Sequence, residues 1–228
     1  MKFELKKVVP WGRNLKEYQE MFNLSNNDLD KNIISFGDGP ASFNSELNNL
    51  GKKCTSIDLI YQFSETELKE RFEVVKKQVM EQVRNNTENF TWNNIKTPDE
   101  LENLRVKSMS DFLNDFSKGK KEKRYIYHSL PEKLNFKEQT FDLGLSSHFL
   151  LLYPKLGIDF HIQSINEMLR LCKEIRIFPI LNLNAEKSEM LNDIIKHFGK
   201  NYTVNIEKVK YEFQKGGNEM LTLKHKSQ

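Results

Sequence analysis

The chain has 228 residues, a length that suits one α/β domain with a sizeable core better than two domains. Its 35 basic and 32 acidic residues are interspersed and leave a formal charge of +3, so no strong basic field favours DNA as a partner. The two cysteines, Cys54 and Cys172, lie in apolar stretches without metal-ligand spacing, so we predict buried free thiols of a reducing compartment and no metal site.

The first thirty residues are predicted to form a helical segment. Residues 14–22 place Leu15, Tyr18, Met21 and Phe22 on one apolar helix face. The sequence before them, MKFELKKVVPWGR, lacks the apolar run of a secretory signal, and no stretch approaches the ~18 apolar residues of a membrane helix. We therefore expect a cytoplasmic bacterial protein with no membrane partner.

Residues 31–58 have the pattern of a strand, a glycine turn, a helix and a second strand that ends on an acid. Apolar residues 33–36 lead into the turn Gly37-Asp38-Gly39-Pro40. In such a unit the glycines let the backbone approach a ligand, and an acid about 20 residues later can accept ribose hydroxyls. Asp58 stands at that interval from Gly39. The pattern predicts the first half of a nucleotide-type cofactor site.

The residues after the glycines indicate which cofactor to expect. Ser42 stands where a dinucleotide fingerprint requires Gly or Ala beside the pyrophosphate, and with Pro40 it disfavours an NAD(P)-linked oxidoreductase. The turn instead resembles the GxGxx loop of class I S-adenosylmethionine (SAM) dependent methyltransferases, and residues 129–153 resemble the third and fourth motifs of that family. The segments VVPWGR, GDGPASFN, SSHFLLLY and YEFQKGGNEML together resemble a small bacterial subgroup of these enzymes.

The resemblance implies an α/β fold with the Rossmann-like, seven-stranded class I methyltransferase sheet, mostly parallel, with helices on both faces and a C-terminal antiparallel hairpin. Residues 174–180 are expected to be the fifth strand, and residues 211–213 and 220–223 the arms of the hairpin. Two positions depart from the family pattern: Ser35 replaces an acid and Ala41 replaces the last glycine. Asp38 can offer a nearby carboxylate to the ammonium group of SAM.

Residues 1–228 are expected to be a single methyltransferase domain, with 1–30 as the N-terminal helical segment and 60–122 as a helical insertion after the second strand. Ser64 and Thr97 begin capping boxes, and Pro98 suits a first helical position. The apolar stripe of the second helix indicates either core packing or a lid over the cofactor, because ligands of open α/β sheets bind outside the carboxyl ends of the strands. A lid would bring Trp92 and Arg105 to the substrate.

The family resemblance also implies the cofactor, SAM, and its product, S-adenosylhomocysteine (SAH). When the family's cofactor contacts are transferred to the matching motifs of this chain, the resemblance implies these cofactor-binding residues: Gly37, Asp38, Gly39, Pro40, Asp58, Leu59, Ser129, Leu130 and Ser146. SAM brings its own leaving group, so such an enzyme has mainly to align a nucleophile and to remove its proton where it has one.

The end of the fourth strand, where the resemblance places the methyl group, carries His148 as the candidate general base, with orientation of the loop as its alternative role. Tyr153 and His161 follow closely enough to share the rim of the site. Trp11 and Arg13 precede the first strand, and Arg13 is either a surface residue or the partner of a carboxylate, that of SAM or that of an acidic acceptor.

The leading hypothesis is therefore a SAM-dependent methyltransferase with a small-molecule acceptor. A protein or RNA acceptor is compatible with the same motifs. The alternative is a catalytically silent module that binds SAM or SAH and acts through a partner. Ser35 and the sparse catalytic signature are compatible with this alternative.

Overall fold

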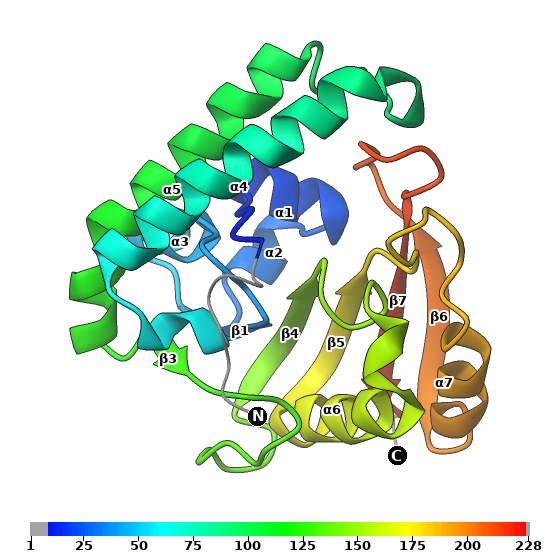
Figure 1. The fold of residues 1–228 in the computed structure, drawn as a ribbon. Coiled ribbons are helices and arrows are strands. Elements are labelled where there is room, and N and C mark those ends of the chain that lie inside the picture. Colours follow the sequence, from blue (N-terminus) through cyan, green and yellow to red (C-terminus); the bar gives the residue numbers. More distant parts are fainter. Residues whose placement is uncertain (1–8, 227–228) are drawn as a thin grey trace.

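The computed structural model describes residues 9–226, in which seven strands form one sheet in the order β3-β2-β1-β4-β5-β7-β6 (Figure 1). The strands are β1 (Ile33–Phe36), β2 (Cys54–Asp58), β3 (Tyr125–Tyr127), β4 (Phe141–Ser147), β5 (Cys172–Phe178), β6 (Tyr202–Lys208) and β7 (Glu219–His225). The first five are parallel, and β7 runs antiparallel to β5 and β6. This is the Rossmann-like sheet of the class I methyltransferases, so the predicted fold class is confirmed.

The central strands are buried on both faces, as a parallel sheet covered by helices requires. All four residues of β1 are buried, and so is every residue of β4 except Asp142. By contrast, β6 at the edge of the sheet has no fully buried residue. The fifth strand begins at Cys172 rather than at the expected residue 174, because its pairing with β4 starts opposite Phe141.

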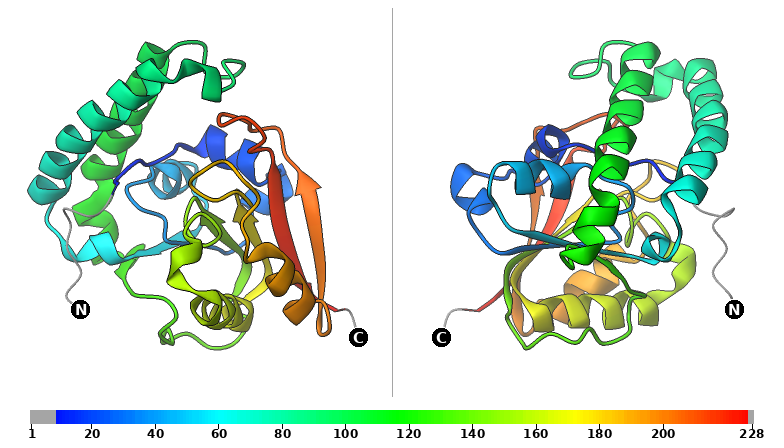
Figure 2. Two further views of the ribbon diagram at one scale, coloured as in Figure 1. Left: turned by 45° about the vertical axis from the view of Figure 1, so that its right-hand side comes forward. Right: turned by 90° about the vertical axis from the view of Figure 1, so that its left-hand side faces the viewer.

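Helices pack against both faces of the sheet, as the resemblance predicted (Figure 2). One face is covered by α1 (Leu15–Met21), α2 (Asn26–Leu29) and α3 (Phe43–Asn49), and the other by α6 (Ile158–Leu171) and α7 (Leu191–Phe198). The rings of Tyr18 and Phe43 stack 4.1 Å apart and join α1 to α3. This stacking holds the N-terminal helix above the segment that follows β1.

The expected insertion is a long helical hairpin between β2 and β3. It consists of η2 (Leu59–Gln62), α4 (Glu65–Asn85), η3 (Thr87–Asn89) and α5 (Pro98–Lys121). Both predicted helix starts are confirmed: Ser64 forms a capping box with Glu67, and the Thr97 side chain accepts from the N–H of Glu100. In Figure 1 the hairpin runs along one side of the sheet, and its far end approaches the loop between β6 and β7.

The expected bounds of the C-terminal hairpin need a correction. Its first arm is β6, which ends at Lys208, so residues 211–213 are not a strand. Instead the segment 209–218 leaves the sheet and reaches the α4–α5 linker, where Phe213 stacks on Phe90 with ring centroids 4.7 Å apart. The N–H of Thr91 also donates to the carbonyl oxygen of Phe213 at 2.7 Å. Aromatic burial therefore overrides the alternating pattern that suggested a strand.

Residues 1–8 of the expected segment 1–30 lie outside the described residues, and the remainder contains α1 and α2. Both cysteines are buried free thiols, as the sequence predicted. Within residues 9–226, no helix is both long and apolar enough to cross a lipid bilayer.

Candidate active site

Three adjoining cavities lie beyond the carboxyl ends of β1, β2, β4 and β5, around the point where the strand order reverses between β1 and β4. Ligands of open α/β sheets bind at such a point. We name them the glycine-loop chamber, the apolar chamber and the aromatic chamber. The glycine-loop chamber shares Gly37 and Tyr153 with the apolar chamber, and Arg13 and His148 with the aromatic chamber, so the three form one branched site.

The apolar chamber encloses about 420 Å³ beyond the end of β2. Its walls are Gly37, Ile57, Asp58, Leu59, His128, Ser129, Leu130, Phe149, Tyr153, Leu156 and Phe160. Four of the predicted cofactor contacts, Asp58, Leu59, Ser129 and Leu130, thus line one cavity. Asp58 is the only acid in this wall, so the chamber combines an apolar surface with a single carboxylate.

The carboxylate of Asp58 is held by the backbone on both sides. Its Oδ2 accepts from the N–H of Gly39 and its Oδ1 from the N–H of Ile60, each at 2.8 Å. Every carboxylate oxygen has a second lone pair, so Asp58 can still accept from hydroxyl groups. Burial raises the pKa of Asp58 to about 6 despite these two N–H groups, which lower it.

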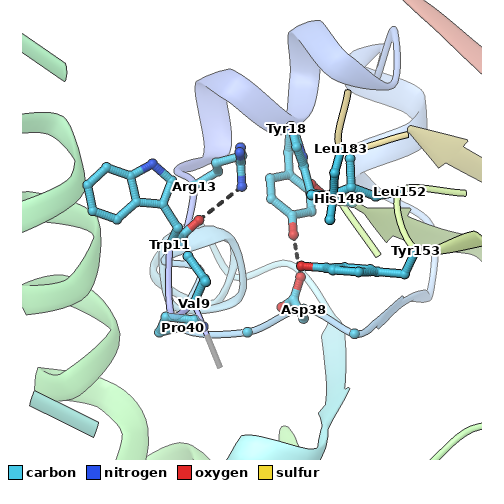
Figure 3. Close-up of a pocket in the computed structure, with 14 residues that line it drawn as sticks. Val9, Trp11, Arg13, Tyr18, Asp38, Pro40, His148, Leu152, Tyr153 and Leu183 are labelled. Carbon is cyan, nitrogen blue, oxygen red and sulfur yellow. Dashed lines mark hydrogen bonds between the residues drawn. The ribbon is translucent and has the colours of Figure 1, made fainter. Parts of the chain in front are cut away.

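The glycine-loop chamber encloses about 220 Å³ above the turn that follows β1 (Figure 3). Gly37 and Gly39 have φ values of 63° and 59°, a region that favours glycine. A Cβ at Gly37 would lie 2.6 Å from the Phe149 ring, whereas a Cβ at Gly39 would meet no atom within 4 Å. Gly37 is therefore required for packing, and Gly39 leaves the backbone of the loop open towards a ligand.

Asp38 lines this chamber but is only 5% exposed. The hydroxyls of Tyr18 and Ser35 donate to its Oδ1, and that of Ser56 donates to Oδ2 at 2.5 Å (Figure 3 shows the Tyr18 bond). Burial raises the pKa of Asp38, and the three hydroxyls oppose that shift. The arrangement accounts for Ser35 at the family's acid position: Ser35 holds a carboxylate supplied three residues later.

Residues 9–14 cross the glycine loop as a leader, and the crossing requires a glycine. A Cβ at Gly12 would lie 2.0 Å from the carbonyl oxygen of Pro40. The N–H of Ser42 donates to the carbonyl oxygen of Arg13 at 3.1 Å. This contact places Trp11 and Arg13, two predicted substrate residues, in the wall of the glycine-loop chamber.

Arg13 has an incomplete set of partners. One terminal NH group donates to the carbonyl oxygen of Trp11 at 2.9 Å, and the buried Nε has no hydrogen-bond partner. No carboxylate of residues 9–226 lies within 4 Å of the guanidinium. Burial lowers the pKa of Arg13, yet an arginine stays charged. Tyr211 is a further neighbour of the guanidinium and favours its charged form. A buried cation with no carboxylate partner among these residues is suited to a carboxylate from a ligand.

The expected substrate contact Arg105 lies instead in a buried ion pair. It donates two hydrogen bonds to Glu17, at 2.7 and 2.5 Å, and the Tyr211 hydroxyl donates to the same carboxylate at 3.2 Å. Burial raises the pKa of Glu17, but the charge and hydrogen bonds of Arg105, together with the charge of Arg13, outweigh burial and lower this pKa. Arg105 is 1% exposed and lines none of the three chambers, so its place is structural.

His148 follows β4 directly and faces both the glycine-loop and the aromatic chamber. Its φ of 51° is unusual for a residue with a side chain, and its N–H donates to the carbonyl oxygen of Phe178 at 2.6 Å. The ring Nδ1 lies 2.9 Å from Oγ of Ser147, whose hydroxyl points to the sulfur of Met21. We assign the ring proton to Nδ1 on this basis, which leaves Nε2 as an acceptor. Burial lowers the pKa of His148 well below its ordinary value, and the nearby positive charge of Arg13 lowers it further.

The remaining predicted residues are divided. Tyr153 lines two chambers, as the sequence predicted for the rim. Ser146 is fully buried in β4, and its Oγ has no partner among the described residues. His161 is also fully buried, and both ring nitrogens bond carbonyl oxygens, those of Gly157 and Leu150. Trp92 packs edge-on against Phe213 and lines none of the three chambers.

Several site residues were not found by sequence reasoning. Phe149, Leu152 and Phe160 line the chambers from the β4–α6 region, and Tyr18 does so from α1. The residues missed in the aromatic chamber are Phe90, Phe178, Pro179, Leu183, Tyr211, Phe213, Gln214 and Gly217. Tyr18 gave a usable signal, because a phenol on an otherwise apolar helix face needs a buried partner.

The residues fit SAM in composition. The apolar chamber with Asp58 suits an adenosine group, since the walls are apolar and the carboxylate can accept ribose hydroxyls. Among residues 9–226, the glycine-loop chamber carries one cation, Arg13, and one acid, Asp38, which together match a zwitterionic amino-acid end.

No family model matches the chain. It is 41% identical over 225 residues to the uncharacterized protein MJ0045 of Methanocaldococcus jannaschii, which covers 96% of this chain and 97% of that protein. Among solved structures, the PH0226 protein of Pyrococcus horikoshii OT3 is 10% identical with a TM-score of 0.50, over 99% and 100% of the two chains. A TehB-like SAM-dependent methyltransferase from Corynebacterium glutamicum is 14% identical with a TM-score of 0.46, over 86% and 81%. The similarity to PH0226 supports the fold alone.

Proposed function

The chain belongs to the family of the Methanocaldococcus jannaschii protein MJ0045, and we propose that it is a methyltransferase that moves the methyl group of SAM to a small-molecule acceptor. The observation that carries the proposal is the pair of joined chambers at the strand-order reversal. One ends on the Asp58 carboxylate within apolar walls, and the other carries Arg13 and Asp38 with opposite charges. Together they match adenosine and a zwitterionic amino acid in one molecule.

Each chamber has a proposed part in holding the cofactor. Asp58 accepts the ribose hydroxyls, while Leu59, Ser129 and Leu130 surround the base. In the second chamber Arg13 pairs with the amino-acid carboxylate, and the loop Gly37 to Pro40 with Asp38 faces the ammonium end. Arg13 rather than a loop N–H is favoured for the carboxylate, because the N–H of Gly37 bonds Ile57 and that of Gly39 bonds Asp58.

Bound SAM supplies a methyl group already activated by its sulfonium. The acceptor's lone pair forms the bond to the methyl carbon as the C–S bond breaks, and the electron pair of that bond stays on sulfur to give SAH. His148 is proposed to take the acceptor's proton at Nε2, because its lowered pKa keeps the imidazole neutral near pH 7. The rigid loop after β4 fixes where that proton can be taken.

A small acceptor is favoured by the size of the aromatic chamber, which holds about 240 Å³. The α4–α5 linker and the segment 209–218 meet across it through the stacked rings of Phe90 and Phe213. The helical hairpin would thus act as a lid over the acceptor rather than over the cofactor. A macromolecular acceptor would have to present a group small enough to enter this chamber beside His148.

Calorimetric titration of the purified protein with SAM, SAH and NAD⁺ tests the proposal. We expect micromolar affinity for SAM and SAH and none for NAD⁺, and a loss of affinity in Asp58→Ala. The matched control is Asp142→Ala, because Asp142 pairs with Lys173 outside the three chambers. Binding of NAD⁺ or of neither sulfur compound would refute the cofactor assignment. Binding without transfer to any acceptor would favour the silent, partner-dependent module.

A further inference from the structure

The aromatic chamber has walls of an unusual composition. It is lined by Arg13, Phe90, His148, Leu152, Phe178, Pro179, Leu183, Tyr211, Phe213, Gln214 and Gly217. Four of these side chains carry aromatic rings besides the imidazole, and none is an aspartate or a glutamate. Within the part of the chain that the structure describes, Arg13 is the only lining residue with a permanent charge. The walls therefore offer flat apolar surfaces and a single basic residue at the junction with the glycine-loop chamber.

The aromatic wall is held in place by several contacts between distant segments. Phe213 stacks on Phe90 with centroids 4.7 Å apart and meets Trp92 edge-on at 5.5 Å. Across the chamber, Phe178 and Tyr211 meet edge-on at 5.8 Å. Two backbone hydrogen bonds tie the segments together: the N–H of Thr91 donates to Phe213, and the N–H of Lys215 donates to Asn89. Preorganised rings favour a planar partner, because offset and edge-on ring pairs add to the energy of burial.

The charges of the wall exclude most ionised ligands. An amine would enter a chamber that has no acid and lies beside the Arg13 cation, so it would lose its hydration without gaining a partner. An anion could pair only with Arg13, whose remaining edge matches the carboxylate of the proposed cofactor. Once that pair has formed, the chamber offers no further cation. An uncharged ligand is left as the best match.

We propose that this chamber binds the methyl acceptor and that the acceptor is a small phenol, an uncharged aromatic ring whose hydroxyl lies beside His148. The inference rests on the proposed function and adds the acceptor class to it. The O–H proton passes to Nε2 of His148, the oxygen bonds the methyl carbon, and the C–S electron pair stays on sulfur. A phenol also suits a weak base such as His148, because its hydroxyl is far more acidic than that of an alcohol.

Ligand-observed NMR titrations of the SAH-saturated protein test this with four probes: phenol, cyclohexanol, benzoate and benzylamine. We expect phenol to bind at least about threefold more tightly than cyclohexanol, from ring packing. Benzoate and benzylamine are expected to bind about tenfold more weakly than phenol, because each buries an unpaired charge. Equal binding of phenol and cyclohexanol, or tighter binding of either charged probe, would overturn the proposal.

Two substitutions locate the binding. Phe213→Leu removes one of the four rings and should reduce the preference for phenol over cyclohexanol, while the SAH affinity stays within about twofold. The matched control, Phe136→Leu, alters a ring that packs on Phe141 outside the chambers and should change neither quantity. A ring preference in Phe213→Leu that is as large as in the wild type would place the phenol elsewhere and overturn the assignment.

A change of cofactor fragment tests the charge argument. Methylthioadenosine lacks the amino-acid end of SAH, so it should leave Arg13 free and improve benzoate binding about tenfold relative to the SAH complex. Unchanged benzoate binding would contradict the assignment of Arg13. If SAH itself fails to bind, the proposed function falls. The probe series on the protein alone would then still show whether the chamber selects neutral rings.

Discussion

Asp58→Asn keeps a side chain of similar size with one acceptor oxygen. It removes the negative charge that we propose binds the ribose hydroxyls. In the wild type, Oδ1 and Oδ2 are oriented by the N–H groups of Ile60 and Gly39. Hydrogen bonds to a charged group contribute about 1.5–3 kcal/mol, so Asp58→Asn should weaken SAH binding roughly tenfold to a hundredfold at pH 7.5.

The pKa of Asp58 adds a pH dependence with a defined sign. The pKa is raised from 3.8 to about 6, so at pH 5 only about one carboxyl in ten is ionised in the protein without SAH. Hydroxyl donors favour the ionised form, so binding should release a proton, and SAH affinity should rise about tenfold from pH 5 to pH 7.5. The same raised pKa gives a contribution to folding stability that is full below pH 3.8 and is lost as the pH rises through 6.

Calorimetry at pH 5, 6 and 7.5, in two buffers of different ionisation enthalpy, measures both the affinity and the protons released. Asp58→Asn should flatten the profile and approach the wild type at pH 5. Asp142→Asn, which alters an exposed ion pair with Lys173, should retain the wild-type slope. A pH-independent affinity in the wild type, or an unchanged affinity in Asp58→Asn, would refute the assignment of Asp58 to the ribose.

Three further changes probe the rest of the site. Glu17→Gln should destabilise the fold by about 3–5 kcal/mol in denaturant titration, because it leaves Arg105 buried without its partner. Gly12→Ala should lower the free energy of unfolding by about 1–3 kcal/mol, because its Cβ would clash with Pro40 and displace the leader. In calorimetry it should weaken the binding of SAH more than that of adenosine. The ring of His148 should stay neutral in NMR titrations as the pH falls through 6.5, and the stability it contributes above pH 6.5 should be lost below it.

Matched changes outside the site separate these effects from general damage. Glu102→Gln breaks an exposed ion pair with Arg84 and should lower the free energy of unfolding by at most about 1 kcal/mol. Gly199→Ala brings a Cβ within 2.8 Å of a carbonyl oxygen on α7 and should leave SAH affinity unchanged. A small loss in Glu17→Gln, equal losses of SAH and adenosine in Gly12→Ala, or protonation of His148 near pH 6.5 would each contradict the corresponding argument.

The parts of the fold that were predictable have local signals in the chain. Each helix of the insertion has a start signal of at most four consecutive residues. Ser64 and Glu67 mark the start of α4, and Thr97 and Pro98 mark the start of α5. The glycine turn and Asp58 lie within one βαβ unit, whose geometry fixes their distance. The sequence therefore predicted the sheet and the insertion, and it brought the glycine turn and Asp58 to the same end of the sheet, because each depends on contacts between near neighbours in the chain.

The proposed acceptor side was not predictable by the same means, because its contacts join residues far apart in sequence. Glu17 and Arg105 are 88 positions apart, and Thr91 and Phe213 are 122 apart. A single arginine on an amphipathic helix gives no local sign that its partner is a buried glutamate. Residues 211–213 even gave a misleading sign, since their alternation fits an edge strand equally well.

Glu17 connects the three segments that build the proposed acceptor side. It belongs to α1 beside the leader, it pairs with Arg105 of the helical hairpin, and it accepts from Tyr211 of the segment 209–218. The cofactor side depends instead on β1, β2 and their turns, which do not contact this carboxylate. A stabilised Glu17→Gln protein should therefore lose selectivity among acceptors before it loses affinity for SAH. If both were lost together, the two halves of the site would be coupled through the leader, since Arg13 is the residue that they share.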